Sequence, residues 1–342
     1  MLALVKAENS AGLWLQQVAR PIPAADEVLI QIRKTGICGT DLHIWNWDDW
    51  ARKTVPVPLV TGHEYAGEIV EVGKLVSHLR PGMRVSGEGH IIDINSAAAR
   101  AGRFHLDPNT RGIGVNRPGA FAEYLALPAF NVIPLPDEID DELGAILDPL
   151  GNAVHVALSF DLVGEDVLIT GAGPIGIMAA AVARHVGARN VVLTDVNPVR
   201  LALASRVADV VTVNPREMPL ADVMSRLHIV NGFSVGFEMS GYNEALEQLI
   251  GAMEPGGRVA CLGLPSGRIS LDWSRIVCKG LFLKGIYGRE MFETWRKMLN
   301  LIATGLDVRG IITHRLPVDR YKEGFQAMLA GDAGKVVLSW PA

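Results

Sequence analysis

The stretch TGICGTDLHIW contains three side chains able to carry metal or proton chemistry: Cys38, Thr40 and His43. A thiol in such a setting serves as a metal ligand, as a nucleophile or as a small buried hydrophobe. Further along, GHEYAG supplies His63 and Glu64. Cysteine, histidine and carboxylate are ligands that zinc accepts, and a catalytic zinc takes three protein ligands and keeps one position open. Because these residues are far apart in the sequence, spacing alone leaves a packing role for Cys38 open.

A second chemical signal is the glycine-rich stretch VLITGAGPIG, which follows an apolar strand pattern and opens a helical one. Gly171 allows a tight turn, Gly173 lets the backbone approach a pyrophosphate, and Gly176 lets helix and strand pack closely. Asp195 ends the next apolar run, about 20 residues further on, where a carboxylate binds the adenosine ribose and repels a 2′-phosphate. We therefore expect NAD rather than NADP. Arg200 is expected to pair with Asp195 or to cover the adenine.

The sequence around these residues shows two patterns, one in each half of the chain. Residues 1–147 consist of short extended runs separated by Gly and Pro, which predicts a β-rich, barrel-like domain. Residues 148–290 alternate six apolar strand patterns with helical ones, which predicts a parallel sheet covered on both faces. Residues 291–342 are too short to form a core alone, and we expect them to complete the first domain.

Bulk properties exclude several classes of protein. The net charge of −5, without basic clusters, argues against a nucleic-acid surface. The first 30 residues lack the long apolar core of a secretory signal, and the most apolar stretch is broken by glycines and a proline. Three scattered cysteines suggest no disulfide framework, so a cytoplasmic protein is expected.

The motifs KTGICGTDLHIW, GHEYAGEIVEVG and GMRVSGEGH, followed by the glycine loop, resemble the zinc-dependent medium-chain dehydrogenases in order and spacing. The segment GIYGREMFETW is more specific and is similar to the bacterial branch of that family that oxidises L-threonine with NAD. The resemblance implies an α/β protein with a GroES-like catalytic domain and a Rossmann domain with a doubly wound parallel sheet. It also implies L-threonine as the substrate and a homotetramer.

The same resemblance assigns roles to individual residues. Cys38, His63 and Glu64 correspond to ligands of one catalytic zinc, and Asp148 to a further ligand or a proton-relay acid. Thr40 and His43 match the family's proton relay, and His90 is expected to enter the substrate pocket. Further cofactor positions implied by the resemblance lie in the glycine loop and after the fifth and sixth strands of the sheet: Ile175, Leu262, Gly263, Leu264, Ile286 and Tyr287.

One segment departs from the family. Relatives carry four cysteines that bind a structural zinc, where this chain has Asp93, Ser96, Ala99 and Asp107. This set cannot complete a tetrahedral zinc site, so we expect no structural zinc and a lobe held by ordinary contacts, for example by Asp93 or Asp107 with Arg100 or Arg103. Loss of these cysteines leaves the homotetramer open to doubt.

Two other functions stay open at this point. One is a zinc-dependent dehydrogenase of the same fold acting on a polyol or a 2,3-diol. The other is a catalytically idle NAD-binding protein, which the joint presence of the zinc and relay residues disfavours.

Overall fold

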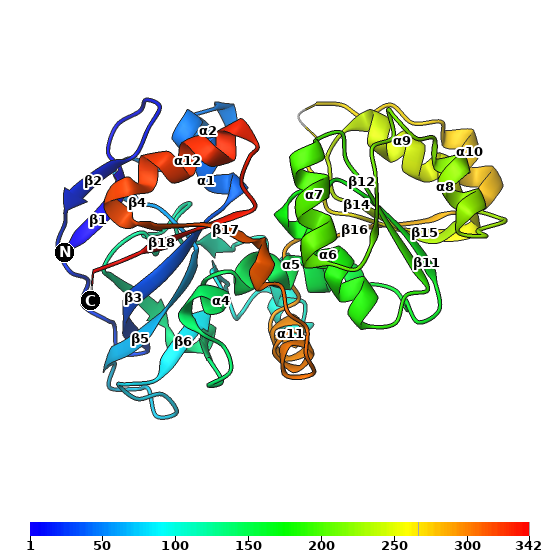
Figure 1. The fold of residues 1–342 in the computed structure, drawn as a ribbon. Helices are drawn as coiled ribbons and strands as arrows, with labels where there is room; N and C mark the ends of the chain where they lie inside the picture. Colours follow the sequence, from blue (N-terminus) through cyan, green and yellow to red (C-terminus); the bar gives the residue numbers. More distant parts are fainter. Residues whose placement is uncertain (266, 342) are drawn as a thin grey trace. The chain divides into compact units, whose positions relative to one another are not determined.

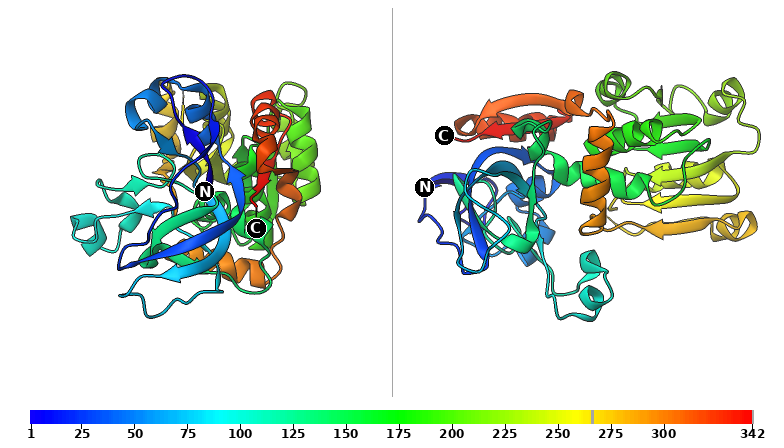
Figure 2. Two further views of the ribbon diagram at one scale, coloured as in Figure 1. Left: turned by 90° about the vertical axis from the view of Figure 1, so that its left-hand side faces the viewer. Right: turned by 90° about the horizontal axis from the view of Figure 1, so that it is seen from below.

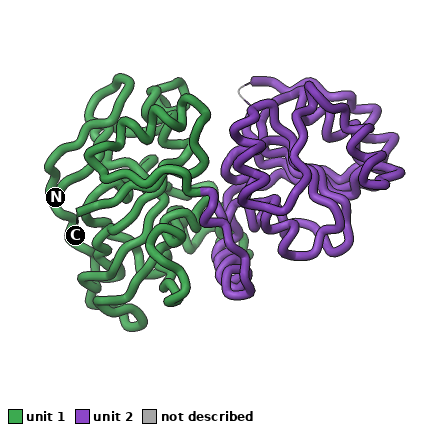
Figure 3. Tube along the Cα trace, viewed as in Figure 1, with its two compact units in different colours: residues 1–149, 312–342 green, residues 150–311 purple. Residues whose placement is uncertain are grey.

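The computed structural model describes residues 1–265 and 267–341. The chain folds into two compact units, one formed by Met1–Pro149 with Ile312–Ala342 and the other by Leu150–Ile311 (Figure 3). The first unit is therefore discontinuous in sequence.

The return point lies at residue 312 rather than at the expected residue 291. The short 3-10 helix η3 (Arg309–Ile311) contacts helices α6 (Pro174–His185) and α7 (Pro198–Val207) of the second unit. The segment between the sixth strand and this helix therefore packs with the second unit, and only the residues after it complete the first.

The first unit is dominated by β-structure, in agreement with the sequence-based prediction (Figures 1 and 2). Its largest sheet has the strand order β10-β6-β5-β3-β18-β17, with β9 also paired to β3, and the smaller sheets have the orders β2-β1-β4 and β7-β8. The strands are β1 (Leu2–Lys6), β2 (Trp14–Gln17), β3 (Glu27–Ile37), β4 (Leu59–Val60), β5 (Glu64–Val72), β6 (Arg84–Gly87), β7 (His90–Ile91), β8 (Arg111–Gly112), β9 (Tyr124–Pro128), β10 (Val132–Pro134), β17 (Ile312–Pro317) and β18 (Lys335–Ser339).

The register of three of these strands matters for the site. The long strand β3 pairs antiparallel with β5, placing Gly36 opposite Glu64, and with β18, placing Ile37 opposite Val336. The end of β3, the start of β5 and the start of β18 therefore meet at one place in the sheet. The C-terminal strand is thereby brought beside a motif near the N-terminus.

Short helices join and flank these strands. They are α1 (Gly39–Asn46), α2 (Asp49–Thr54), α3 (Ala97–Arg100), η1 (Phe104–Leu106), η2 (Ala129–Asn131), α4 (Asp141–Ala145), η4 (Val318–Arg320) and α12 (Tyr321–Ala330), while α5 (Leu147–Ala157) spans the first boundary between the units. The core of the unit includes side chains from both ends of the chain, such as Ile30, Ile69, Phe121 and Phe325. Burial of these apolar surfaces explains why the C-terminal segment returns.

The second unit is the parallel sheet that the alternating pattern predicts. Its strand order is β13-β12-β11-β14-β15-β16, and all of its strand pairs are parallel. Numbered within the unit this is 3-2-1-4-5-6, the order of a full dinucleotide-binding sheet. The strands are β11 (Asp166–Thr170), β12 (Asn190–Thr194), β13 (Val211–Val213), β14 (Phe233–Glu238), β15 (Met253–Cys261) and β16 (Phe282–Gly285).

Helices cover both faces of this sheet, which explains why its strands read as continuous apolar runs (Figures 1 and 2). Helices α6 and α7 contact β11, β12 and β13, whereas α9 (Asn243–Ala252) and α10 (Trp273–Lys279) contact β11, β14 and β15. The remaining helices of this unit are α8 (Leu220–Arg226) and α11 (Glu293–Ala303). Within the described chain, no helix combines the length and apolar character needed to cross a bilayer.

Candidate active site

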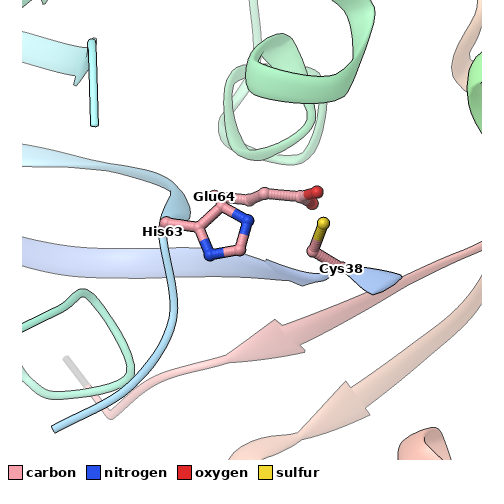
Figure 4. A group of neighbouring side chains, drawn as sticks. All are labelled: Cys38, His63 and Glu64. Carbon is pink, nitrogen blue, oxygen red and sulfur yellow. The ribbon is translucent and has the colours of Figure 1, made fainter. Parts of the chain in front are cut away.

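Three potential metal ligands converge at the end of β3. Cys38 directly follows β3, while His63 and Glu64 stand at the entry to β5, and their ligand atoms all lie within 4.8 Å of one another (Figure 4). Gly36, opposite Glu64 in the register, makes this possible, since a Cβ at that position would lie 2.1 Å from Glu64 Oε2. The antiparallel pairing thus turns two distant motifs into one cluster.

The cluster contains a buried polar atom that the described residues do not satisfy. Glu64 Oε1 is buried and has no hydrogen-bond partner among these residues. Leaving a buried polar atom unpaired costs about 1–3 kcal/mol, and more for a charged group. A cation bound by sulfur, nitrogen and oxygen matches this donor set, and three protein ligands leave a zinc ion one open position. The residues present therefore fit a catalytic zinc.

Asp41, in the first turn of α1, supports this cluster from behind. One carboxylate oxygen accepts a hydrogen bond of 2.9 Å from the Cys38 backbone N–H, and the other lies 3.8 Å from His63 Nδ1. A carboxylate beside one imidazole nitrogen orients the ring so that the other nitrogen serves as a ligand. Complete burial raises the pKa of Asp41 to about 6, an effect that nearby His63 partly opposes.

Several acidic groups surround the metal cluster. Burial alone would lower the pKa of His63, but Cys38 and Asp41 raise it well above its ordinary value. Asp148, in the first turn of α5 and 8% exposed, adds to the charges that raise this pKa. Asp148 is not a member of the three-residue cluster. The surroundings of the cluster therefore favour a bound cation.

Lys335, the first residue of β18, contributes a buried positive charge. Its ammonium group donates hydrogen bonds to Glu64 Oε2 and, at 2.8 Å, to the Ile37 carbonyl, and its side chain is 2% exposed. Burial would lower the pKa of Lys335, but Glu64 and Cys38 raise it above its ordinary value. The C-terminal strand thus supplies the counter-charge for one oxygen of Glu64 and leaves the other facing the cluster.

Thr40 and His43 lie on α1, which begins directly after Cys38. They are three residues apart, a spacing that places side chains on the same face of a helix. The Thr40 side chain is half-buried, whereas that of His43 is 60% exposed and forms a hydrogen bond of 2.5 Å through Nδ1 with Asp48 Oδ2. Helix α1 therefore carries a hydroxyl near the cluster and an imidazole near solvent.

His90 begins β7 and is held by a buried carboxylate. Its Nδ1 lies 2.7 Å from Oε1 of Glu88, which is fully buried. Asn131 donates hydrogen bonds to the carbonyls of both Glu88 and His90. Between these two residues, a Cβ at Gly89 would lie 3.9 Å from the His63 Cβ, so the segment carrying His90 passes beside the metal cluster.

In the second unit, the glycine loop lies between β11 and α6. Gly171 has a φ of +101°, and a Cβ at Gly176 would lie 2.0 Å from the Gly171 carbonyl oxygen, so local structure explains both glycines. Gly173 caps α6 with a φ of −67°, and an added Cβ there would meet nothing within 4 Å. Neither backbone strain nor packing requires glycine at this position, which points to a ligand that approaches the backbone at the helix N-terminus.

Asp195 follows β12 and faces this loop. Its Oδ2 accepts a hydrogen bond of 2.8 Å from the Ala172 N–H, and its Oδ1 accepts one from the Asn197 N–H. Arg200 Nη1 lies 3.8 Å from the same carboxylate.

The other cofactor positions expected from the sequence surround the same end of the sheet. Ile175 lies in the first turn of α6, and a Cβ at Gly263 would lie 2.3 Å from the Gly241 N. Leu264 and Tyr287 are 91% and 58% exposed. Leu262 follows β15 and Ile286 follows β16, at the carboxyl ends where parallel sheets bind ligands.

Comparison with known proteins agrees with this geometry. The family model described as alcohol dehydrogenase GroES-like domain matches residues 24–137, and the one described as zinc-binding dehydrogenase matches residues 174–304. The chain belongs to the zinc-dependent medium-chain dehydrogenases. The L-threonine 3-dehydrogenase of Ruegeria pomeroyi is 62% identical over 341 residues, covering 99% of this chain and 100% of the relative.

Two further similarities extend the comparison. The L-threonine 3-dehydrogenase of Chelativorans sp. is 59% identical over 340 residues, covering 99% of both chains. The crystal structure of a zinc-binding dehydrogenase from Sinorhizobium meliloti 1021, bound to NADP, is 28% identical, with a TM-score of 0.90 over 99% of this chain and 98% of that one.

In this medium-chain dehydrogenase, the lobe without cysteines is organised around a carboxylate. The Asp107 side chain accepts hydrogen bonds of 2.6 Å from the Asp93 N–H and 3.2 Å from the Asn109 N–H. Ser96 caps the short helix α3 through the Ala99 N–H. The Asp107 carboxylate thus accepts hydrogen bonds from backbone N–H groups and from the Ser96 side chain, whereas the sequence suggested ion pairs with arginine.

The sequence did not reveal every residue of this dehydrogenase's site. Asp41 has a local signal, since it lies three residues after Cys38 at the start of a helix, where a carboxylate accepts backbone N–H groups. Lys335 has no such signal, because 271 positions separate it from Glu64. Only the pairing of β18 with β3 brings the two together.

Proposed function

We propose that this chain is an L-threonine 3-dehydrogenase that oxidises the Cβ hydroxyl of L-threonine to give 2-amino-3-oxobutanoate, with NAD accepting the hydride. The observation that carries the proposal is the cluster of Cys38, His63 and Glu64 with the unpartnered Glu64 Oε1, in a chain 62% identical to an L-threonine 3-dehydrogenase. The identity supports the substrate, and the cluster supports the chemistry.

Cys38, His63 and Glu64 are proposed to hold the zinc ion. Zinc held there supplies Lewis acidity, which favours loss of the proton from the substrate hydroxyl. Asp41 Oδ1, which lies 3.8 Å from His63 Nδ1, is proposed to orient the His63 ring, and Lys335 holds one oxygen of Glu64. Because Asp148 lies outside the ligand cluster, we assign it a charge or proton-relay role rather than ligation.

The first unit also supplies the route for the proton. Thr40 takes the proton that leaves the substrate hydroxyl and gives its own to His43, whose exposed ring releases a proton to water. His90, held by Glu88, is proposed to bind the amino acid part of the substrate.

The second unit is proposed to bind NAD. The glycine loop and the N-terminus of α6 bind the pyrophosphate, and Asp195 binds the ribose hydroxyls and repels a 2′-phosphate. Ile175, Leu262, Gly263, Leu264, Ile286 and Tyr287 are proposed to line the adenosine and nicotinamide halves of the site. NAD supplies the hydride acceptor, and the protein supplies orientation.

We also propose a homotetramer in the cytoplasm. The edge strand β16 carries the exposed Phe282, and the neighbouring helix α10 exposes Trp273 and Val277, an apolar surface suited to contact with another copy. The three cysteines are free thiols, which suits a reducing compartment.

The test is NADH formation from L-threonine and NAD, measured before chelation, after chelation and after zinc restoration. We expect turnover that chelation abolishes and zinc restores, with one zinc per chain by metal analysis. Turnover on a 2,3-diol in place of threonine would keep the site and overturn the substrate. Zinc bound without turnover on either substrate would overturn the proposal.

A matched pair of variants assigns the metal ligand. Cys38→Ser is expected to lose zinc and activity together, because a hydroxyl is a much poorer zinc ligand than a thiolate. Cys278→Ser changes an exposed thiol on α10 in the same way and is expected to keep both. Equal zinc content in the two variants would contradict the assignment of Cys38.

A further inference from the structure

The His43 side chain is exposed, and two neighbouring side chains hold its position. Its side chain is 60% exposed, and an exposed imidazole normally samples several rotamers. Here the ring forms a 2.5 Å hydrogen bond through Nδ1 with Asp48 Oδ2 and meets the Trp50 ring edge-on, with centroids 5.9 Å apart. Both contacts come from the segment that follows α1.

The turn between α1 and α2 holds Asp48 firmly in place. Trp47 ends α1 in the left-handed conformation, with a φ of 53°, and is 5% exposed. Lys6 Nζ lies 4.4 Å from the centroid of its ring and donates a 2.9 Å hydrogen bond to the Ile44 carbonyl of the same helix. Arg52, on α2, donates to the Trp47 carbonyl. This anchored turn directs the next residue, Asp48, back towards the last turn of α1.

The Asp48 carboxylate divides its two oxygens between two partners. Oδ1 accepts a 3.0 Å hydrogen bond from the Ala51 N–H and so caps α2, while Oδ2 faces His43. Burial would raise the pKa of Asp48, but the Ala51 N–H and His43 hold it below its ordinary value. Asp48 is therefore an ionised acceptor for the Nδ1 proton of His43.

We propose that Asp48 is the positioning residue of the proton relay. By accepting the Nδ1 proton of His43, it fixes the tautomer in which Nε2 is the proton acceptor, and it stabilises the ring while that ring carries the extra proton. Thr40 passes a proton to Nε2, Nδ1 keeps its own proton towards Asp48, and the proton on Nε2 then leaves to water. This inference rests on the proposed function, since it needs His43 to act as the relay.

The test uses Asp48→Asn, because asparagine caps helices about as well as aspartate and so preserves α2 while removing the charge. Losing a charge-assisted hydrogen bond predicts a kcat roughly ten- to a hundredfold lower. The KM values for L-threonine and NAD are expected to stay unchanged. Added imidazole buffer is expected to restore part of the rate, which would not happen if the residue were only structural. Asp49→Asn, the same change at the next position with a side chain 89% exposed, serves as the control and keeps wild-type kcat.

A double-variant comparison separates this inference from the proposed function. If Asp48 acts through His43, then adding Asp48→Asn to His43→Gln does not lower kcat any further. An equal fall in kcat in both backgrounds, or no fall in either, would overturn the role of Asp48 but not the proposed dehydrogenase function. Wild-type kcat in His43→Gln alone would overturn the relay itself and this inference with it. Thermal unfolding and zinc content show whether each variant is folded, and Asp48→Ser, also a good cap, replaces Asp48→Asn if that variant is unstable.

Discussion

Methionine has a side chain of similar length to lysine but no charge. Replacing Lys335 by methionine therefore removes a buried positive charge beside the metal cluster. Glu64 is fully buried, one of its oxygens already lacks a partner, and the other is paired with Lys335. The Ile37 carbonyl would lose a donor as well. Breaking a buried ion pair by removing one partner costs about 3–5 kcal/mol, and we expect a loss of that size in the free energy of unfolding of the zinc-free protein.

Urea unfolding of the chelated protein, followed by tryptophan fluorescence, measures this loss. Trp340 reports on the region directly, since it directly follows β18 and its indole N–H donates to Thr35 on β3. Lys34→Met is the matched control, because Lys34 also joins β3 to β18 through Ser339 but is 26% exposed. Such a partly exposed contact is worth about 0–1 kcal/mol.

Two further measurements sharpen the argument. With zinc bound, Lys335→Met is expected to lower the free energy of unfolding by less, because the metal then compensates the charge of Glu64. Adding Glu64→Gln is expected to recover part of the loss in the zinc-free protein, since it removes the uncompensated charge. A loss no greater than that of Lys34→Met, or one unchanged by Glu64→Gln, would refute the reasoning.

Three other predictions follow from contacts outside the metal cluster. Lys6→Met removes the ammonium group that donates hydrogen bonds to three backbone carbonyls, each worth about 1 kcal/mol, so the free energy of unfolding measured in urea is expected to fall. The same change at the exposed Lys74 is expected to leave it unchanged. Asp195→Ala is expected to reduce the ratio of kcat/KM for NAD to that for NADP by roughly tenfold or more, and an unchanged ratio would show that Asp195 does not select the cofactor. Burial would raise the pKa of Asp107, but backbone N–H groups hold it below its ordinary value. The ionised Asp107 therefore stabilises the folded lobe at pH values above its pKa in the unfolded chain, and this stabilisation is lost as the pH falls through its pKa in the folded protein. Proteolysis of the lobe is therefore expected to speed up in acid and, for Asp107→Asn, already at neutral pH; equal rates for variant and wild type would contradict this.

Much of the fold was readable from local sequence because its signals are local. The six strands of the parallel sheet appeared as short apolar runs separated by helical patterns, and the glycine loop lies between the first of them and a helix, as predicted. The β-rich character of the first unit was likewise visible from its turn residues. The boundary at residue 312 was not, because it depends on η3 packing against α6 and α7, and no local pattern encodes that contact.

The site divides in the same way. The types and order of Cys38, His63 and Glu64, and the resemblance they carry, were enough to predict a zinc dehydrogenase, and the family assignment is confirmed. The structure of the lobe was harder to predict. The absence of cysteines excluded a structural zinc, but it did not indicate that Asp107 would accept hydrogen bonds from backbone N–H groups.

By itself, then, the sequence determined the chemical groups available and the local elements that carry them, since turn chemistry, periodicity and ligand type act over a few residues. Tertiary structure alone decided which groups support one another. Lys335 meets Glu64 only because burial of apolar side chains on both strands sets the register of β18 on β3, and Asp48 meets His43 only because a buried tryptophan and Lys6 fix the turn between two helices. These contacts depend on the packing of the whole unit, which no short stretch of sequence records.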